Sequence, residues 1–503
     1  MKVAVVGSGV SGLGATWLLN EHSEHEAHLY EADSRPGGHA NTITYTPPGN
    51  PDAAVDVDTG FIVLNPTTYP NFLRFLKLKN VSILPTEMTF SVSRDRGLFE
   101  WAGNNLFTVF AQPSRLLDAK MWRLIYDVLR FNACARRLIV GKMKDGEDRG
   151  IGRYLDENNY SDSFRDNYLI PMTAAVWSTP PDKCALDFPA RTLIQFLNNH
   201  HLLQITGKPS WLTIKGGSRI YVNKILASLA KSHLRLSTPV KSIQTSPKSN
   251  NANSVVLTTA DGQTETYDHV ILACHSDQAL ALLRAGGGAT ADEERVLGRF
   301  GWNRNEAVLH SDVALMPKRR LAWACWNYLT SSTVDANGKR KANVDQVALT
   351  YWMNDLQHLS EKKFGPVLVT LNPPFEPREN LTAGRWSYSH PVLDSKAVLS
   401  QSELPLIQNT RAISFAGAWT RYGFHEDGFT SGLRCASEHI PRVTPPFALE
   451  DPDREPGGLW VGYIFDIIEA FGVRSFVGVL VSFVLRVFRV FFGVFVDLSH
   501  IDR

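Results

Sequence analysis

The chain opens with a short apolar run, a glycine-rich turn and a longer apolar segment, the pattern of a strand followed by a helix. Residues 2–6 are almost wholly apolar, and the segment that ends at Asn20 is rich in Ala and Leu. A second apolar run, 27–30, ends in the acidic Glu31 at the distance that a βαβ unit requires. We therefore predict a strand, a helix and a second, parallel strand in this region.

Later parts of the chain show other patterns. From about 87 to 203 the apolar spacing is mostly helical and aromatic, whereas alternation within 254–273 and 347–371 predicts strands. A second strand that runs into glycine follows at 414–419, and 425–438 has helical spacing. The order of these patterns predicts an α/β protein in which a sheet-rich unit is interrupted by a second unit.

The turn at residues 7–12, Gly-Ser-Gly-Val-Ser-Gly, has the spacing of a dinucleotide-binding loop. Gly7 permits the tight turn, Gly9 lets the backbone approach a pyrophosphate, and Gly12 lets the helix pack closely on the strand. The helix N-terminus attracts the pyrophosphate, and Glu31 can accept hydrogen bonds from a ribose 2′-hydroxyl. The cofactor-binding candidates in this first motif are Gly7, Gly9, Val10, Ser11, Gly12, Glu31 and Ala32.

Three further segments carry a family resemblance. Residues 35–39, Arg-Pro-Gly-Gly-His, resemble the RxGGR element of the flavin amine oxidase and phytoene desaturase superfamily, with His39 at the position of the family's terminal Arg. The segments 56–65 and 422–428, with DTGFIVLN and GFHEDG, resemble its subgroup of amine-oxidase-like predicted NAD/FAD-binding oxidoreductases. The resemblance covers nearly all of residues 1–445 and implies non-covalently bound FAD.

The resemblance also implies further cofactor contacts. In relatives the backbone at the Gly60 position lies close to the flavin, the Val240 position meets the adenine, and the strand end at Gly417 leads to the flavin. Either Glu426 or Asp427 is placed to accept a ribityl hydroxyl, and a helix cap by Asp427 is a compatible alternative. The residues added by the resemblance are Gly37, Gly38, His39, Thr59, Gly60, Val240, Gly417, Glu426, Asp427 and Gly428.

His425 is the candidate catalytic residue. It is the obvious titratable side chain where the family meets the flavin, and an imidazole can act as acid or base near neutral pH. A structural histidine bonded to the backbone is the open alternative. The adjacent His200 and His201 point in different directions on a helix and have no acidic or cysteine neighbours, so we expect no metal site.

These signals predict an α/β fold with a discontinuous, Rossmann-type FAD-binding domain of the glutathione-reductase-like kind. A substrate domain with a mixed sheet and helices is inserted into it, and an apolar helical tail follows. The expected parts are 1–86, 211–298 and 400–445 for the FAD-binding domain, 87–210 and 299–399 for the substrate domain, 446–457 for a linker and 458–503 for the tail.

Composition narrows the class of protein. The chain has 503 residues, 44% apolar and 20% charged, which is typical of a globular protein with more than one domain. A net charge of +2 gives no reason to expect a nucleic-acid partner. The 5 cysteines are scattered without a CxxC pair, so the sequence favours a reducing compartment over a disulfide framework.

The tail is intensely apolar. From 476 to 496 almost every residue is Val, Phe or Leu, except for a stripe that includes Ser482, Arg486 and Arg489. Two arginines inside a single span would cost roughly 2.5–3.5 kcal/mol each. A helix that lies in the membrane surface avoids this cost, so we expect membrane association on the cytoplasmic side. A true span and docking against the body are the alternatives.

Three functions are compatible with these signals. The leading one is a membrane-associated, FAD-dependent oxidoreductase that abstracts hydride from an apolar, lipid-like or isoprenoid substrate. The second is a redox-neutral flavin isomerase, or a desaturase, of an acyl or polyene chain. The third is a non-enzymatic prenyl- or lipid-binding protein of the same fold, against which the intact glycine motifs argue.

Overall fold

A five-stranded parallel sheet carries the first motif. The computed structural model describes residues 1–141, 150–177, 186, 188–204, 207, 209–247, 253–334, 340–343 and 346–493. The strands lie in the order β10 (Leu234–Arg235), β2 (Glu26–Tyr30), β1 (Lys2–Val6), β14 (His269–Leu272) and β22 (Ile413–Phe415), and every neighbouring pair is parallel. The predicted βαβ unit is present, with α1 (Val10–Glu21) between β1 and β2.

Burial explains why these strands read as continuous apolar runs. Val3, Ala4 and Val5 have no exposed surface because both faces of the sheet are covered. A three-stranded antiparallel sheet of β11 (Val240–Pro247), β12 (Asn253–Thr259) and β13 (Thr264–Tyr267) lies beside it. Helix α1 packs against α17 (His425–His439), and its Trp17 contacts Phe75 of α2 (Pro70–Leu78) with 4.9 Å between the ring centroids.

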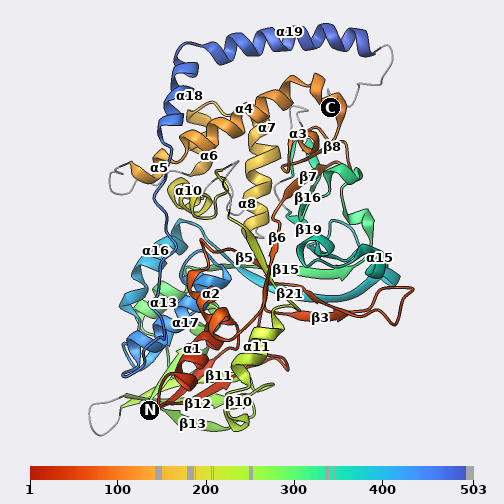
Figure 1. The fold of residues 1–503 in the computed structure, drawn as a ribbon. Coiled ribbons are helices and arrows are strands. Elements are labelled where there is room, and N and C mark those ends of the chain that lie inside the picture. Colours follow the sequence, from red (N-terminus) through yellow and green to blue (C-terminus); the bar gives the residue numbers. More distant parts are fainter. Residues whose placement is uncertain are drawn as a thin grey trace.

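A seven-stranded mixed sheet forms the second unit. Its order is β21 (Thr382–Val392), β15 (Gly301–His310), β20 (Leu368–Leu371), β19 (Ala348–Trp352), β16 (Trp326–Thr330), β7 (Phe90–Arg94) and β8 (Phe99–Ala102). Helices α4 (Ala119–Cys134), α8 (Ile170–Trp177) and α10 (Ala190–Asn199) lie in the same half of the molecule (Figure 1). The fold is therefore the predicted mixed α/β architecture, whereas the domain boundaries themselves stay a prediction.

The segment predicted as a linker lies against the body. Arg421 pairs with Asp451 and Asp453 at 2.5 and 2.8 Å, and Arg434 reaches Asp451 at 2.9 Å. The Asn199 amide donates to the Asp453 carboxylate at 2.8 Å. These contacts fix the path of the chain between α17 and the tail.

Two helices form the described part of the tail. Helix α18 (Trp460–Ala470) packs on α4, where Tyr126 donates to Glu469 at 2.8 Å and Arg137 pairs with Asp466 at 2.8 Å. Helix α19 (Val473–Gly493) then runs across the end of the molecule that is farthest from the parallel sheet (Figure 1). Residues 494–503, which include the end of the predicted apolar run, lie outside the described residues.

Among the described residues, no single helix combines the length and apolar character that a crossing needs. Helices α18 and α19 meet that requirement only as a pair, and they are bent by 68° at the break between them.

Candidate active site

A cavity of about 700 Å³ lies where the two units meet. Its walls include the residues that follow the carboxyl ends of β1, β2, β14 and β22, the edge at which open parallel sheets bind ligands. The opposite walls come from α8, α10, β16, β19 and β21 of the second unit. The cavity therefore joins the predicted nucleotide site to the predicted substrate domain.

The first glycine turn is shaped for a pyrophosphate. Gly7 has a φ of +102°, and a Cβ there would lie 2.6 Å from the Ala273 carbonyl oxygen, so only glycine fits without strain. A Cβ on Gly9 would meet no atom within 4 Å, although Gly9 lines the cavity. Gly9 is also the N-cap of α1, whose first backbone N–H groups and positive dipole end favour a phosphate group.

Glu31 is held in place at the end of β2. Its carboxylate accepts hydrogen bonds from the backbone N–H and the hydroxyl of Ser8, at 2.8 and 2.5 Å, and from the backbone N–H of Asp33 at 2.8 Å. Three donors fix the orientation of this carboxylate at the cavity wall, in the place where a ribose hydroxyl is expected. The geometry suits the predicted ribose contact.

The predicted site residues divide into two groups. The residues that line the cavity are Gly7, Gly9, Val10, Ser11, Glu31, Ala32, Gly38, His39, Gly60, Val240, Gly417 and His425. Those outside its lining are Gly12, Gly37, Thr59, Glu426, Asp427 and Gly428. The second group supports the wall: a Cβ on Gly12, for example, would lie 1.9 Å from the Gly7 carbonyl oxygen.

Glu426 and Asp427 cap helices. The Glu426 carboxylate accepts the backbone N–H groups of Asn71 and Phe72, each at 2.9 Å, at the N-terminus of α2. Asp427 accepts the backbone N–H of Phe424 at 2.9 Å and so caps its own helix, α17. Burial raises the pKa of both carboxyl groups to about 7. A contact from either side chain to a ribityl hydroxyl stays a prediction.

His425 is held rigidly in the cavity wall. Its Nε2 lies 2.8 Å from the Tyr221 hydroxyl, and its ring stacks on Phe61 with 3.7 Å between the centroids. Burial lowers the pKa of His425 to about 3, so the imidazole is neutral at physiological pH. Tyr221 and Phe61 explain how the ring is oriented, but these contacts do not show that it takes part in the reaction. The catalytic role of His425 stays a prediction.

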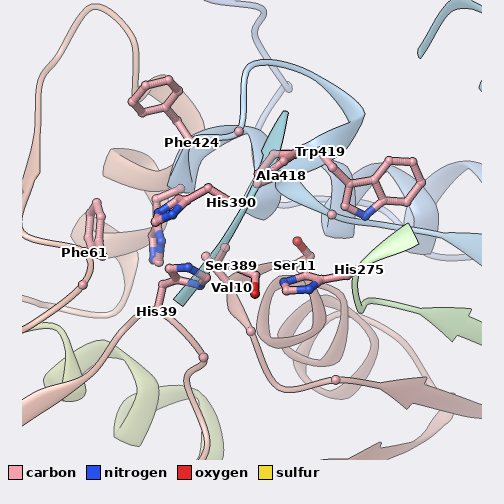
Figure 2. A pocket seen from close by; sticks show the side chains of 18 of the residues that line it. Val10, Ser11, His39, Phe61, His275, Ser389, His390, Ala418, Trp419 and Phe424 are labelled. Carbon is pink, nitrogen blue, oxygen red and sulfur yellow. The ribbon is translucent and has the colours of Figure 1, made fainter. Parts of the chain in front are cut away.

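The cavity is also lined by two histidines that no sequence motif indicated. Figure 2 shows His275 and His390 beside His39, around the space in front of the start of α1. His390 Nδ1 lies 2.8 Å from the Asn305 side-chain amide nitrogen, which only donates, so the ring proton is on Nε2. Burial lowers the pKa of His390 to about 4 and holds that of His39 well below its usual range. The cavity therefore contains neutral imidazoles.

The fold and this cavity define a flavoenzyme built from a dinucleotide-binding unit and a substrate unit. The chain belongs to the family of flavin-containing amine oxidoreductases, whose model matches residues 10–294. It is an FAD-dependent oxidoreductase, and FAD is its cofactor. This membership favours the enzyme over the non-enzymatic lipid-binding alternative.

Solved structures share the fold at low sequence identity. Cyclohexylamine oxidase from Brevibacterium oxydans IH-35A is 14% identical, with a TM-score of 0.58 over 87% of this chain and 99% of that one. A CLA-producing fatty acid isomerase from P. acnes is 13% identical, with a TM-score of 0.57 over 86% and 96%. A putative protoporphyrinogen oxidase from Exiguobacterium sp. 255-15 is 13% identical, with a TM-score of 0.55 over the same shares, 86% and 96%. No curated protein sequence matches the chain.

Loss of the Glu31 carboxylate should weaken FAD binding. Glu31→Ala removes a charge-assisted hydrogen bond of about 1.5–3 kcal/mol, roughly a ten- to hundredfold loss of affinity. Gly9→Val should bind FAD more weakly still, because the valine side chain would enter the open space above the turn, where the pyrophosphate is expected. Titration of the apoprotein with FAD measures both, with the exposed Glu24→Ala as the matched control. FAD affinity equal to wild type in both site variants would contradict the assignment.

His425→Ala should lower turnover more than FAD content. Removal of an acid–base group typically costs roughly a hundredfold or more in rate. Tyr221→Phe, which removes only the hydrogen bond to Nε2, should cause a smaller fall. His201→Ala, outside the cavity lining, should behave like wild type. An unchanged rate for His425→Ala, with normal FAD content and Tm, would leave His425 as a structural residue.

Proposed function

We propose that this FAD-dependent oxidoreductase acts on an apolar, lipid-like or isoprenoid substrate. One observation supports this more than any other. The end of the cavity that is lined by the second unit, here called the substrate end, carries no ionic side chain. Among the described lining residues there is no Lys or Arg, and the sole carboxylate is Glu31 at the nucleotide end. The walls of the substrate end are instead aromatic and aliphatic, as in Trp177, Phe196, Trp326 and Tyr351.

Desolvation makes this cavity unsuited to a cation. A buried ammonium group needs a nearby opposite charge, because an isolated ion loses far more hydration energy than apolar walls return. A neutral polar group costs much less to bury when the cavity offers it a hydrogen-bond partner. The Trp326 indole N–H is buried without a hydrogen-bond partner in the described structure, and His390 carries its ring proton on Nε2. Such donors suit the oxygen of a neutral, lipid-like molecule.

FAD supplies a two-electron acceptor, which suits the removal of hydride from a carbon–hydrogen bond. Side chains of this protein hold and shield the reacting part of the substrate. The aromatic walls exclude water and orient an extended apolar chain by packing, while the neutral histidines present hydrogen-bonding nitrogens without a fixed charge. The first glycine turn and Glu31 hold the nucleotide end of the cofactor.

A pool experiment tests the substrate class. The purified, yellow holoprotein is incubated without oxygen with isoprenoids, unsaturated acyl lipids or amines, and loss of the flavin's visible absorbance is followed. We expect bleaching by an apolar pool. Trp326→Glu should then reduce that rate at least tenfold, because an unpaired buried carboxylate costs about 1–3 kcal/mol or more. Trp326→Leu is the matched control and should retain most of the rate. Bleaching by amines alone would contradict the proposal.

A redox-neutral isomerase of an acyl chain is the second candidate. The same charge-free walls accommodate an acyl chain, and one structure with this fold is a fatty acid isomerase. The pool experiment separates the two candidates. An isomerase yields a product of unchanged mass and consumes no electron acceptor, whereas an oxidoreductase yields a product two hydrogens lighter for each pair of electrons removed.

We further propose that the tail binds the surface of a membrane on its cytoplasmic side. Along α19 most apolar side chains are exposed: Phe476, Phe483 and Phe491 are 72%, 65% and 70% exposed, whereas Val481 and Leu485 are half-buried. In the predicted polar stripe, Ser482 and Arg489 are half-buried and Arg489 donates to the Leu117 carbonyl at 2.8 Å, whereas Arg486 is exposed. A helix with this orientation can lie in a membrane surface while the protein stays folded.

Charges on the outer face of α19 should release the protein from lipid. Each phenylalanine buried in lipid contributes about 1.5–3 kcal/mol, so the double variant Phe476→Asp/Phe483→Asp should bind vesicles at least tenfold more weakly. Flotation with liposomes measures the binding. Leu399→Asp, at an exposed leucine of α16 (Ser395–Glu403), is the matched control. FAD content should be unchanged in both proteins, and a double variant that floats like wild type would contradict the proposal.

A further inference from the structure

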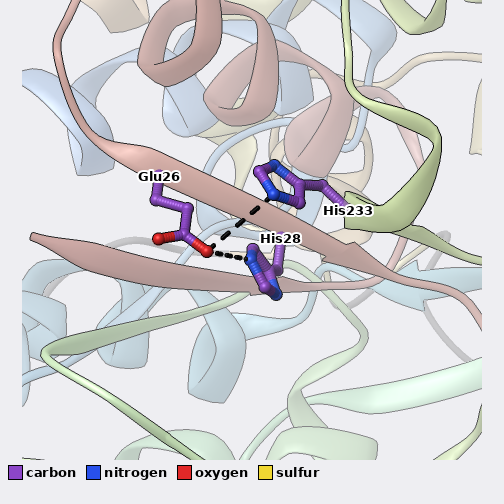
Figure 3. Close-up of side chains that lie close together, drawn as sticks. All are labelled: Glu26, His28 and His233. Carbon is purple, nitrogen blue, oxygen red and sulfur yellow. Dashed lines mark hydrogen bonds and ion pairs between the residues drawn. The ribbon is translucent and has the colours of Figure 1, made fainter.

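A second cluster of ionisable side chains lies at the opposite end of β2 from Glu31. Glu26 and His28 belong to β2, and His233 ends a single turn of 3-10 helix, Lys231–His233, just before β10. Figure 3 shows both imidazole rings directed at the same Glu26 carboxylate. His28 is buried with 3% of its surface exposed, whereas Glu26 is exposed and His233 is half-buried. The cluster is thus accessible from solvent but anchored in the sheet.

The three ligand atoms are spaced for one metal ion. Glu26 Oε1 lies 2.7 Å from His28 Nε2 and 3.8 Å from His233 Nε2, and all three atoms lie within 4.8 Å of one another. Ligand atoms held at about 2.0–2.1 Å from a tetrahedral zinc ion are about 3.3 Å apart, which lies between the first two distances. The two rings stack with 4.4 Å between their centroids, so both nitrogens meet the carboxylate from one side.

The second nitrogen of His28 belongs to a chain of hydrogen bonds. His28 Nδ1 lies 3.0 Å from the Tyr267 hydroxyl, which lies 2.7 Å from the Tyr30 hydroxyl. Tyr30 in turn donates to the Glu265 carboxylate at 2.8 Å. Glu265 is ion-paired with Lys2 and Arg235, so it accepts. If each hydroxyl donates toward Glu265, His28 donates from Nδ1 and its Nε2 keeps a lone pair, the form that binds metal.

A count of protons shows what the cluster lacks. The contacts from Glu26 through His28, Tyr267 and Tyr30 to Glu265 number four, and each needs one proton between its two atoms. A neutral imidazole and two phenols supply three. With the chain directed toward Glu265, a lone pair of His28 Nε2 faces a carboxylate oxygen at 2.7 Å. An extra proton between these atoms, or a metal ion bound beside them by both, resolves the shortage, and a metal ion also uses the nitrogen of His233.

We propose that Glu26, His28 and His233 bind a divalent zinc-type ion, with water completing the coordination. Two imidazoles and a carboxylate are ligands that Zn²⁺ accepts, and the bonded Nδ1 of His28 is the outer-shell support that such ligands require. The ion would join β2 to the segment that leads into the edge strand β10, which pairs with β2 through Leu234 and Arg235.

This position gives the ion a structural task. The edge strand leads directly to the residues that close the nucleotide end of the cavity: the Glu31 backbone N–H donates to the Arg235 carbonyl, and the Thr238 N–H donates to the Glu31 carbonyl, at 2.9 and 2.8 Å. An ion at the other end of β2 would hold the edge of the sheet on which Glu31 is presented. Zinc should therefore raise Tm without changing which substrate is used.

Zinc binding to the full-length, FAD-loaded protein tests this site. After treatment with a chelator, titration calorimetry with Zn²⁺ should give one ion per chain, and X-ray absorption at the zinc edge should show two imidazoles at about 2.0 Å. His233→Ala should bind at least about a hundredfold more weakly, and Tyr267→Phe about ten- to a hundredfold. Glu26→Gln, at an exposed position, is a second ligand variant that leaves the core unchanged.

The matched control is His25→Ala, whose imidazole lies in the turn before β2 and bonds to the Pro441 carbonyl instead of the cluster. It should bind zinc like wild type, and His25→Ala, His233→Ala and Glu26→Gln should keep FAD and the Tm of zinc-free wild type. Either of two results would overturn the proposal. The first is that wild type takes up no stoichiometric zinc, in which case the extra proton of an imidazolium satisfies the Glu26 contact. The second is that His233→Ala and Glu26→Gln bind zinc as wild type does.

Discussion

The close approach of α1 to the strand before it is the constraint on which the rest of the site depends. Helix α1 begins so near the turn that a Cβ on Gly12 would lie 1.9 Å from the Gly7 carbonyl oxygen. Helix α17 then crosses α1 so closely that a Cβ on Gly432 would lie 2.0 Å from the Ser11 carbonyl oxygen. Because glycine has no side chain, Gly12 and Gly432 permit these close approaches. The two cofactor motifs, which are far apart in the chain, can therefore meet at the same edge of the sheet.

Ionic groups are kept to the outside of this arrangement. Glu426 and Asp427 bind the N-termini of α2 and α17 outside the cavity lining, and Glu31 is satisfied by three donors at the nucleotide end. Toward the substrate end the titratable residues His39, His390 and His425 all have lowered pKa values, because burial disfavours the imidazolium form. The same burial that makes the cavity apolar therefore removes charge from its histidines.

Local patterns made the cofactor end of the site predictable. A strand, three glycines and the acid that ends the next strand lie within 31 residues, so their arrangement follows from short-range geometry. His390 was missed because its place in the cavity depends on the pairing of β21 with β15, which brings it to Asn305. The partners of Glu426 were equally hidden, since the N-terminus of α2 reaches it only in the folded chain. His28 and His233 meet through the same kind of long-range pairing, between β2 and β10.

The tail departs from the arrangement that water imposes on a surface helix, because most of its large apolar side chains are exposed. A surface helix normally packs its apolar side on the core and turns its charges outward. In α19 the half-buried side includes Arg489 and Ser482, and Arg489 approaches Asp118 at 3.9 Å, while Val479 and Val490 are 72% and 74% exposed. Docking on the body and the proposed binding to lipid are therefore compatible, because the exposed phenylalanines and valines are not needed for the contacts with the body. The contacts of Glu469 with Tyr126 of α4 and of Asp466 with Arg137 hold α18 on the body, and so fix the place where α19 begins.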